Sequence, residues 1–200
     1  TLTGRKFLVL ETVAMDDLRD APRAAFQSAV ERLQAVGAQV DRGDVSEVSD
    51  IMELTSILYT SEAWGTWKDT IEANPDVMFP EILGRFQLGK SWSAGEYVAA
   101  WQKMEHLRSG YLKATAEYDA VILPTSPILP PNAERLMSDR DYYITENLLA
   151  LRNTRIGNLM GLSSLTLPTD TASCGLMVSC PPNMEELLLR LGAAIEEALR

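Results

Sequence analysis

The chain has 200 residues, of which 46% are hydrophobic and 23% are charged, and its formal net charge at pH 7 is −10. This length and balance are typical of one compact unit with a sizeable core, and they exclude extensive disorder. The negative charge argues against a nucleic-acid-binding surface, which needs clustered lysine and arginine side chains.

The first elements alternate between strand and helix. Residues 6–10 (KFLVL) form a short apolar run without helical spacing, which predicts a buried strand. Residues 20–36 carry apolar side chains at helical spacing, with Pro22 in the first turn and Gly37 directly after the last. Residues 38–45 are a second strand candidate. Strand, helix and strand in succession indicate a βαβ unit, so we expect an α/β sheet.

The middle of the chain is predicted to be helical. Residues 49–72 read as one long helix, and a short helix is expected over 80–88. Ser93 and Glu96 have the spacing of a capping box, which predicts a further helix over 93–117. Three tryptophans in these helices are expected to be core aromatics: Trp64, Trp67 and Trp101.

The last third of the chain combines strands with two helices. Residues 124–140 are rich in proline and polar residues and are predicted to be a loop. A helix is expected over 142–159, ending at Gly161. Asn183 and Glu186 have capping spacing for a final helix. Three strand candidates lie in this part: residues 120–123, 164–167 and 175–179.

The spacing of the cysteines and the length of the apolar runs indicate in which cellular compartment the protein lies. A strand between Cys174 and Cys180 would separate them by roughly 20 Å, which is beyond disulfide reach. No apolar run approaches the roughly 20 residues that cross a bilayer, and the apolar stretch in residues 1–11 is too short for a secretion signal. We therefore expect a cytoplasmic protein with free thiols and no membrane association.

Familiar catalytic motifs are absent from the sequence. There is no phosphate-binding Gly-rich loop and no Gly-x-Ser-x-Gly turn. One histidine and two cysteines at wide spacing predict neither a metal site nor a cofactor. His106 is expected at a solvated helix position. The adjacent Ser163 and Ser164 lack a nearby base and Gly-rich flanks for oxyanion binding, so we interpret them as turn residues entering a strand.

Five short phrases occur in chain order along the sequence: residues 4–10 (opening strand), 37–40 (GA-x-V), 118–125 (YD-apolar-PT), 158–168 (N-x-x-G-L turn and strand) and 175–178, before the Glu-rich terminal helix 185–200. Together they resemble the second half of amidase-signature enzymes. This resemblance covers nearly the whole chain and implies the C-terminal part of the amidase-signature fold, a mixed β-sheet flanked by helices, with residues 1–200 as a single α/β unit.

Two departures from the family's pattern affect the loops. Ser163 stands where the family usually has proline, and the loop over residues 170–174 is short and lacks the usual Gly-Leu-Pro. We expect altered substrate access at this loop, or residues missing from it.

The resemblance also implies what this chain lacks. Family members hydrolyse a carboxylic amide to an acid and an amine or ammonia with a Ser–Ser–Lys triad, whose serines lie in a Gly-Gly-Ser-Ser-Gly-Gly-Ser stretch. Neither that stretch nor the earlier lysine occurs here, because both belong to the family's first half. We therefore expect no catalytic residue, a missing N-terminal half as partner, and exposed apolar surface that favours homo-oligomers.

By the same resemblance, this half forms the wall of the substrate pocket. Thr125 equally fits a turn, Arg152 a solvated helix charge and Asn158 a helix cap. Leu151, seven residues before Asn158, replaces the aspartate with which the glutamine-using branch holds the substrate's amino group, so glutamine is not expected as the substrate. The pocket candidates are Arg85, Thr125, Arg152, Thr154 and Asn158.

Three hypotheses remain open at this point. The chain is a fragment of an amide hydrolase, a non-catalytic binding or assembly module that kept the amidase C-terminal fold, or an unrelated α/β domain that matches by chance. The third hypothesis fails if four residues from separate predicted strands share one sheet: Leu8, Ile122, Leu165 and Val178.

Overall fold

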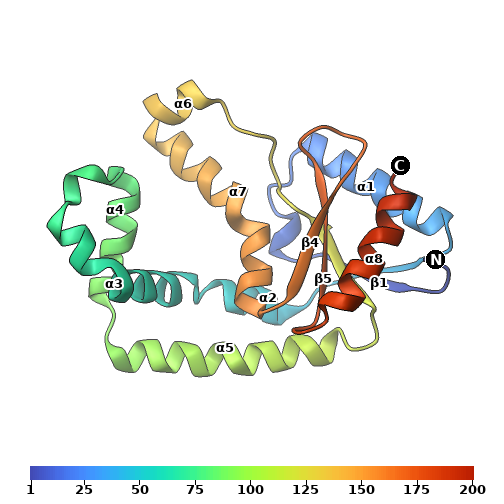
Figure 1. The fold of residues 1–200 in the computed structure, drawn as a ribbon, viewed down its shortest axis with the longest axis horizontal. Coiled ribbons are helices and arrows are strands. Elements are labelled where there is room, and N and C mark those ends of the chain that lie inside the picture. Colours follow the sequence, from blue (N-terminus) through green and yellow to red (C-terminus); the bar gives the residue numbers. More distant parts are fainter.

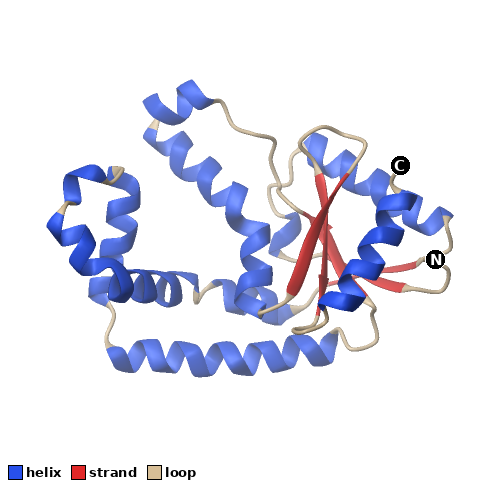
Figure 2. Cartoon of the chain, in the orientation of Figure 1, coloured by secondary structure: helices blue, strands red, loops and turns tan.

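A five-stranded mixed β-sheet organises the chain in the computed structural model, which describes all of residues 1–200 (Figures 1 and 2). Its strand order is β2-β1-β3-β5-β4. The neighbours β2, β1 and β3 are parallel, whereas β5 runs antiparallel to both β3 and β4. The strands are β1 (Lys6–Leu10), β2 (Gln39–Gly43), β3 (Ala120–Pro124), β4 (Ser163–Pro168) and β5 (Gly175–Cys180).

The register of the central strands tests the hypothesis of a chance match. Val178 on β5 lies opposite Ile122 on β3 and opposite Leu165 on β4. Leu8 on β1 lies opposite Val121, the residue before Ile122. All four marker residues therefore share one sheet, and the expected α/β fold with a mixed sheet flanked by helices is confirmed.

Alternation along the strands gives the sheet two apolar faces. Phe7 and Val9 of β1 lie on one face, together with Ile122 and Val178. This face is covered by α1 (Asp20–Ala35) and α8 (Glu185–Ala198), which contribute Phe26, Leu33, Leu191 and Ile195.

The opposite face carries a second core. Leu8 and Leu10 of β1 pack there with Val121 and Leu123 of β3. Three helices cover this face and also extend beyond it: α2 (Ser46–Met52), α5 (Ala94–Ala114) and α7 (Arg140–Met160).

A helical arm projects from this second face (left in Figure 1). It consists of α3 (Thr55–Ala73), η2 (Pro75–Val77), α4 (Pro80–Gln87), η3 (Leu88–Ser91) and the first part of α5. The prediction that the tryptophans are core residues is wrong for Trp67 and Trp101, which are 54% and 37% exposed. Trp64 is half-buried with the Lys90 Nζ 4.2 Å from its ring centre. No second layer of this chain covers the outside of the arm, so its apolar side chains stay in contact with solvent.

Two helix predictions need correction. The helix expected over 49–72 is divided into α2 and α3, where the Thr55 hydroxyl donates to the Met52 carbonyl at 2.7 Å and so competes with helical hydrogen bonding. Asn183 does not cap α8, because its backbone takes the left-handed conformation at φ 63° and Met184 occupies the capping position.

The predicted loop over residues 124–140 needs correction, whereas the predicted capping box at Ser93 is confirmed. The segment 124–140 is not entirely a loop, because it contains the short helix α6 (Ala133–Ser138), whose first turn is capped by the Asn132 side chain accepting from the Arg135 N–H at 2.8 Å. The Ser93–Glu96 capping box is confirmed at the start of α5.

The remaining short helix, η1 (Val13–Met15), follows β1. No helix is both long enough and apolar enough to cross a membrane.

Candidate functional site

A cavity of about 580 Å³ lies between α3, α4 and α7. We call it the α3–α7 cavity. One wall comes from α2 and α3, including Met52 and Tyr59, and a second wall comes from Arg85 and Phe86 of α4. The α7 wall consists of Leu148, Leu151, Thr154, Arg155 and Asn158.

Helical periodicity explains which side chains of α7 reach this cavity. The wall residues recur about once per helical turn, at positions 148, 151, 154 with 155, and 158, as expected for one helix face. The opposite face of α7 carries Asn153, Ile156 and Met160, all of which are buried against the sheet. One face of α7 therefore anchors the helix, and the other is free to bind a ligand.

Contacts near the start of each helix join α4 to α7. The Arg140 guanidinium donates to both carboxylate oxygens of Glu81, at 2.6 and 3.1 Å. The rings of Phe79 and Tyr143 meet edge to face with their centres 5.2 Å apart. These contacts hold α4 at a fixed position relative to the α7 wall.

Two arginines face the cavity without a carboxylate partner. Arg85 donates to the side-chain oxygen of Asn147, and its guanidinium lies 5.9 Å from the centre of the Tyr143 ring. Arg155 is half-buried and forms neither an ion pair within 4.0 Å nor a side-chain hydrogen bond. The cavity therefore has a cationic end.

Burial shifts the pKa values of two groups at this end of the cavity. Burial lowers the pKa of the Arg155 guanidinium, an effect opposed by the Tyr59 hydroxyl and reinforced by Arg85. Burial also raises the pKa of Tyr59, against the effects of Arg155 and of a hydrogen bond with Asn158. Because these pKa values start far above neutrality, Arg155 stays a cation and Tyr59 a neutral phenol at neutral pH.

A smaller hollow of about 290 Å³ adjoins this cavity, and Thr154 and Asn158 line both spaces. Its other residues include Ser164 and Thr166 of β4. The Thr125 hydroxyl donates to the Thr166 hydroxyl at 3.2 Å, so Thr125 stands just behind this hollow. The two spaces thus share the same stretch of α7.

The structure brings three of the five pocket candidates together in the α3–α7 cavity and places two elsewhere. Arg85, Thr154 and Asn158 line it. Thr125 lies behind the smaller hollow. Arg152 is buried on the other side of α7, where its guanidinium donates to the carbonyl oxygens of Ala14 and Asp16.

Arg152 and its neighbour Asn153 therefore fasten α7 to the loops after two strands. The Asn153 amide donates to the Ala14 carbonyl at 3.1 Å and to the Pro124 carbonyl at 2.7 Å, and its side chain is fully buried. Burial lowers the pKa of Arg152, while Asp16 and Asp17 oppose the shift. These contacts determine which face of α7 is turned toward the cavity.

The adjacent serines lie in strand β4 and have no lysine or histidine partner. The Ser163 hydroxyl donates to a Glu185 carboxylate oxygen at 2.8 Å, and the hydroxyls of Ser164 and Ser179 are 2.8 Å apart. His106 is exposed on α5. No lysine or histidine lies within hydrogen-bond reach of either serine, and the one charged partner is the Glu185 carboxylate beside Ser163.

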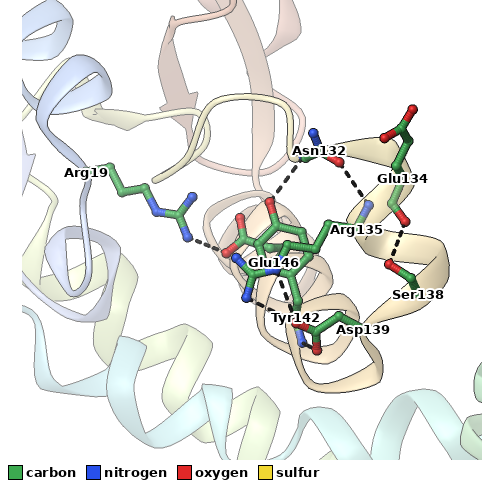
Figure 3. A network of polar contacts seen from close by, with 8 residues as sticks. All are labelled: Arg19, Asn132, Glu134, Arg135, Ser138, Asp139, Tyr142 and Glu146. Carbon is green, nitrogen blue, oxygen red and sulfur yellow. Dashed lines mark hydrogen bonds and ion pairs between the residues drawn. The ribbon is translucent and has the colours of Figure 1, made fainter.

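A polar network fixes the amino end of α7 (Figure 3). The Asp139 carboxylate caps the helix by accepting from the Tyr142 N–H at 3.0 Å and pairs with Arg135 at 3.1 Å. The Asn132 N–H donates to the Tyr142 hydroxyl at 3.1 Å. One turn further along α7, Glu146 pairs with Arg19. The network joins the 124–140 segment to the helix that forms the cavity wall.

Two residues that line the cavity, Arg155 and Tyr59, are not among the pocket candidates predicted from the sequence. The signal for Arg155 was present, because it lies three residues before Asn158 on the face that also carries Leu148 and Leu151. Tyr59 had no such signal, since its position depends on how α3 packs against α7.

Comparisons with known proteins place this chain in a family. The family model described as Amidase matches residues 4–189. A 2-amino-5-chloromuconic acid deaminase from Comamonas testosteroni is 26% identical over 187 residues, which cover 90% of this chain and 40% of the relative. An amidase from Pseudomonas putida is 24% identical over 200 residues, covering 98% of this chain and 43% of the relative.

The fold agrees with this match. A crystal structure of an amidase superposes with a TM-score of 0.82 at 23% sequence identity, covering 99% of this chain and 46% of that protein. The chain thus spans less than half the length of the relatives it matches. With the family model matching nearly all of its residues and the same fold in a solved amidase, the chain belongs to the amidase family.

Proposed function

We propose that this chain is the C-terminal, substrate-pocket-forming portion of an amidase that hydrolyses a carboxylic amide to an acid and an amine or ammonia. The observation that carries the proposal is the α3–α7 cavity, lined by Arg85, Thr154 and Asn158, within a chain of the amidase family. The share of the relatives that the chain spans, 40% and 43%, supports a partial enzyme.

In the proposed reaction, a serine Oγ attacks the amide carbonyl, the C–N bond breaks as the leaving nitrogen takes a proton, and water then hydrolyses the acyl ester. The Ser–Ser–Lys triad comes from an N-terminal half that carries the Gly-Gly-Ser-Ser-Gly-Gly-Ser stretch. The residues of this chain bind and orient the substrate: Arg85, Thr154 and Asn158 touch it, and Thr125 and Arg152 hold the surrounding elements in place.

The missing half is the proposed partner, with self-association as a second mode of assembly. Leu148 and Leu151 of α7 are 46% and 49% exposed, and β4 forms one edge of the sheet. Exposed apolar side chains and an unpaired strand edge both favour association. The free thiols of Cys174 and Cys180 support a reducing, cytoplasmic compartment.

A non-catalytic binding or assembly module is the alternative. It is favoured by one observation, namely that neither Ser163 nor Ser164 contacts a lysine or histidine side chain. The alternative predicts ligand binding without any turnover in the complete gene product.

Amide turnover by the gene's full-length product separates these functions. The region encoding residues before Thr1 should contain the Gly-Gly-Ser-Ser-Gly-Gly-Ser stretch and an earlier lysine, and alanine at the first-half nucleophile should abolish release of the amine or ammonia. The 200-residue chain alone should be inactive. Turnover by this chain that is lost in Ser163→Ala would overturn the assignment of catalysis to the other half.

A further inference from the structure

Side chains from two elements line the smaller hollow. Thr154 and Asn158 belong to its α7 side, and Ser164 and Thr166 belong to its β4 side. The turn after α7 joins the two sides at one end, because β4 begins two residues after the helix cap Gly161. Farther from this turn, the distance between the two sides depends on other contacts.

Asn153, the neighbour of Thr154, connects the α7 side to the end of β3. Its side chain is fully buried, and its amide nitrogen donates to the Pro124 carbonyl at 2.7 Å and to the Ala14 carbonyl at 3.1 Å. Because this nitrogen faces two carbonyl oxygens, which only accept hydrogen bonds, the side-chain amide is satisfied in one orientation. Thr154 therefore follows a residue whose position is fixed relative to Pro124.

Thr125, the residue after Pro124, continues this connection to β4. Its N–H donates to the Gly175 carbonyl at 2.9 Å, and its hydroxyl donates to the Thr166 hydroxyl at 3.2 Å. We call the series of contacts from Asn153 through Pro124 and Thr125 to Thr166 the Asn153–Thr166 connection. It joins the two sides of the smaller hollow away from the turn after α7.

The hydrogen bond between the two threonines crosses a strand. β5 lies between β3 and β4, and strands separated by one neighbour are about 10 Å apart. Gly175 of β5 leaves the space between the threonines open, since a Cβ there would lie 2.7 Å from the Thr166 Cγ2 and 2.8 Å from the Thr125 Oγ1. A residue without a side chain at this position is therefore a condition for the connection.

The Asn153–Thr166 connection lies within this chain. Asn153 and Pro124 are buried, and the hydrogen bonds of the connection join residues of this chain to one another. Thr166 lines the smaller hollow, whereas Thr125 does not. A change confined to the Thr125 hydroxyl therefore alters the hollow through Thr166.

We propose that Asn153 and Thr125 are positioning residues, which hold Thr154 and Thr166 at the separation that binds the amide substrate between α7 and β4. The word substrate rests on the proposed function, whereas the connection is a property of this chain. Neither positioning residue touches the substrate. Asn153 acts through Thr154, and Thr125 acts through Thr166.

Kinetics of the full-length product test the positioning, with benzamide as the probe and ammonia release as the readout. Thr125→Val removes the hydroxyl but keeps the shape of the side chain. It should raise KM about tenfold and leave kcat within about twofold, because the fit is weakened in the ground state and the transition state alike. Thr125→Ser keeps the hydroxyl and should restore the original KM. Gly175→Ala should reproduce the effect of Thr125→Val.

A matched control separates positioning from a general loss of stability. Asn153→Ala should raise KM in the same way as Thr125→Val. Arg19→Gln removes a different attachment of α7, at Glu146, and should lower the free energy of unfolding without changing KM. An unchanged KM in Thr125→Val, or an equal rise in Thr125→Ser or Arg19→Gln, would overturn the positioning.

A double-mutant cycle in urea unfolding of the full-length product tests the connection without turnover. The loss in the double variant Asn153→Ala/Thr125→Val should be smaller than the sum of the two single losses, whereas the losses of Arg19→Gln and Thr125→Val should add. Additive losses for the first pair would refute the connection. Non-additive losses in a product that does not hydrolyse benzamide would contradict the proposed function and support the connection. Turnover with an unchanged KM in Thr125→Val would support the enzyme and refute the positioning.

Discussion

The guanidinium of Arg19, at the start of α1, is ion-paired with the carboxylate of Glu146 on α7, although the two residues are 127 positions apart in the sequence. The Glu146 side chain is 2% exposed and the Arg19 side chain 48%. The second carboxylate oxygen of Glu146 is buried without a hydrogen-bond partner. The pair joins the helix of one sheet face to the helix that forms the cavity wall (Figure 3).

This asymmetry in burial predicts unequal costs for removing either partner. Arg19→Gln leaves a buried carboxylate without its cation and should lower the free energy of unfolding by about 2–4 kcal/mol. Glu146→Gln leaves a half-exposed guanidinium and should cost less, about 1–2 kcal/mol. Urea unfolding of both variants and of the double variant measures the coupling. Equal losses for the two single variants would contradict this account.

Asn153 predicts a second stability effect. Asn153→Ala removes the donor for the buried carbonyl oxygens of Ala14 and Pro124, and we expect a loss of about 2–3 kcal/mol. Thr154→Ala, at the exposed neighbouring position, is the control and should change the free energy of unfolding by less than about 0.5 kcal/mol. Similar unfolding midpoints in urea for both variants would show that the Asn153 bridges are dispensable.

Two glycines of the arm should respond in opposite directions to alanine. A Cβ at Gly89 would collide with the Thr60 carbonyl oxygen and lie 2.5 Å from the Trp64 Cβ, so Gly89→Ala should separate η3 from α3 and lower the Tm. Gly84 lies within α4 with nothing near its Cβ position, and Gly84→Ala should stabilise by about 0.5–1 kcal/mol. Thermal unfolding followed by circular dichroism checks both signs.

Stability should fall in alkaline solution partly through Cys180. Burial raises the pKa of this thiol to about 11, with a smaller contribution from Asp119, whereas an unfolded cysteine has a pKa of about 8.5. The folded state therefore holds the proton more tightly, and the stabilisation is complete below about pH 8.5 and is lost as pH rises toward 11. Cys180→Ala should flatten the decline in urea-unfolding free energy between pH 8.5 and 10. An unchanged slope would exclude this thiol as the cause.

Exposed leucines on α7 predict self-association of the chain. Light scattering should give a mass above the 22.1 kDa of one chain, because Leu148 and Leu151 leave apolar surface in contact with water. Replacing both with glutamate should shift the mass toward 22.1 kDa. Gln102→Glu, at an exposed polar residue on α5, serves as a control. A single species of one-chain mass at high concentration would contradict the prediction.

The sequence by itself determined the local elements and the family. The continuous apolar run over residues 6–10 and the helical spacing over residues 20–36 are local properties of the sequence. The capping box of Ser93 and Glu96 is local as well and was found at its place. The ordered phrases from residue 4 onward identified the amidase family, whose model matches the chain.

Only the tertiary structure decided the strand order and the composition of the site. Whether β5 pairs with β3 or another strand depends on long-range packing that no local pattern encodes. Arg152 and Arg155 are the same residue type on the same helix. The hydrogen bonds of Asn153 to the Ala14 and Pro124 carbonyls nevertheless turn Arg152 inward and leave Arg155 facing the cavity. Burial and pairing of a charge are set by what surrounds it in space, so the unpaired guanidinium became visible only in the folded chain.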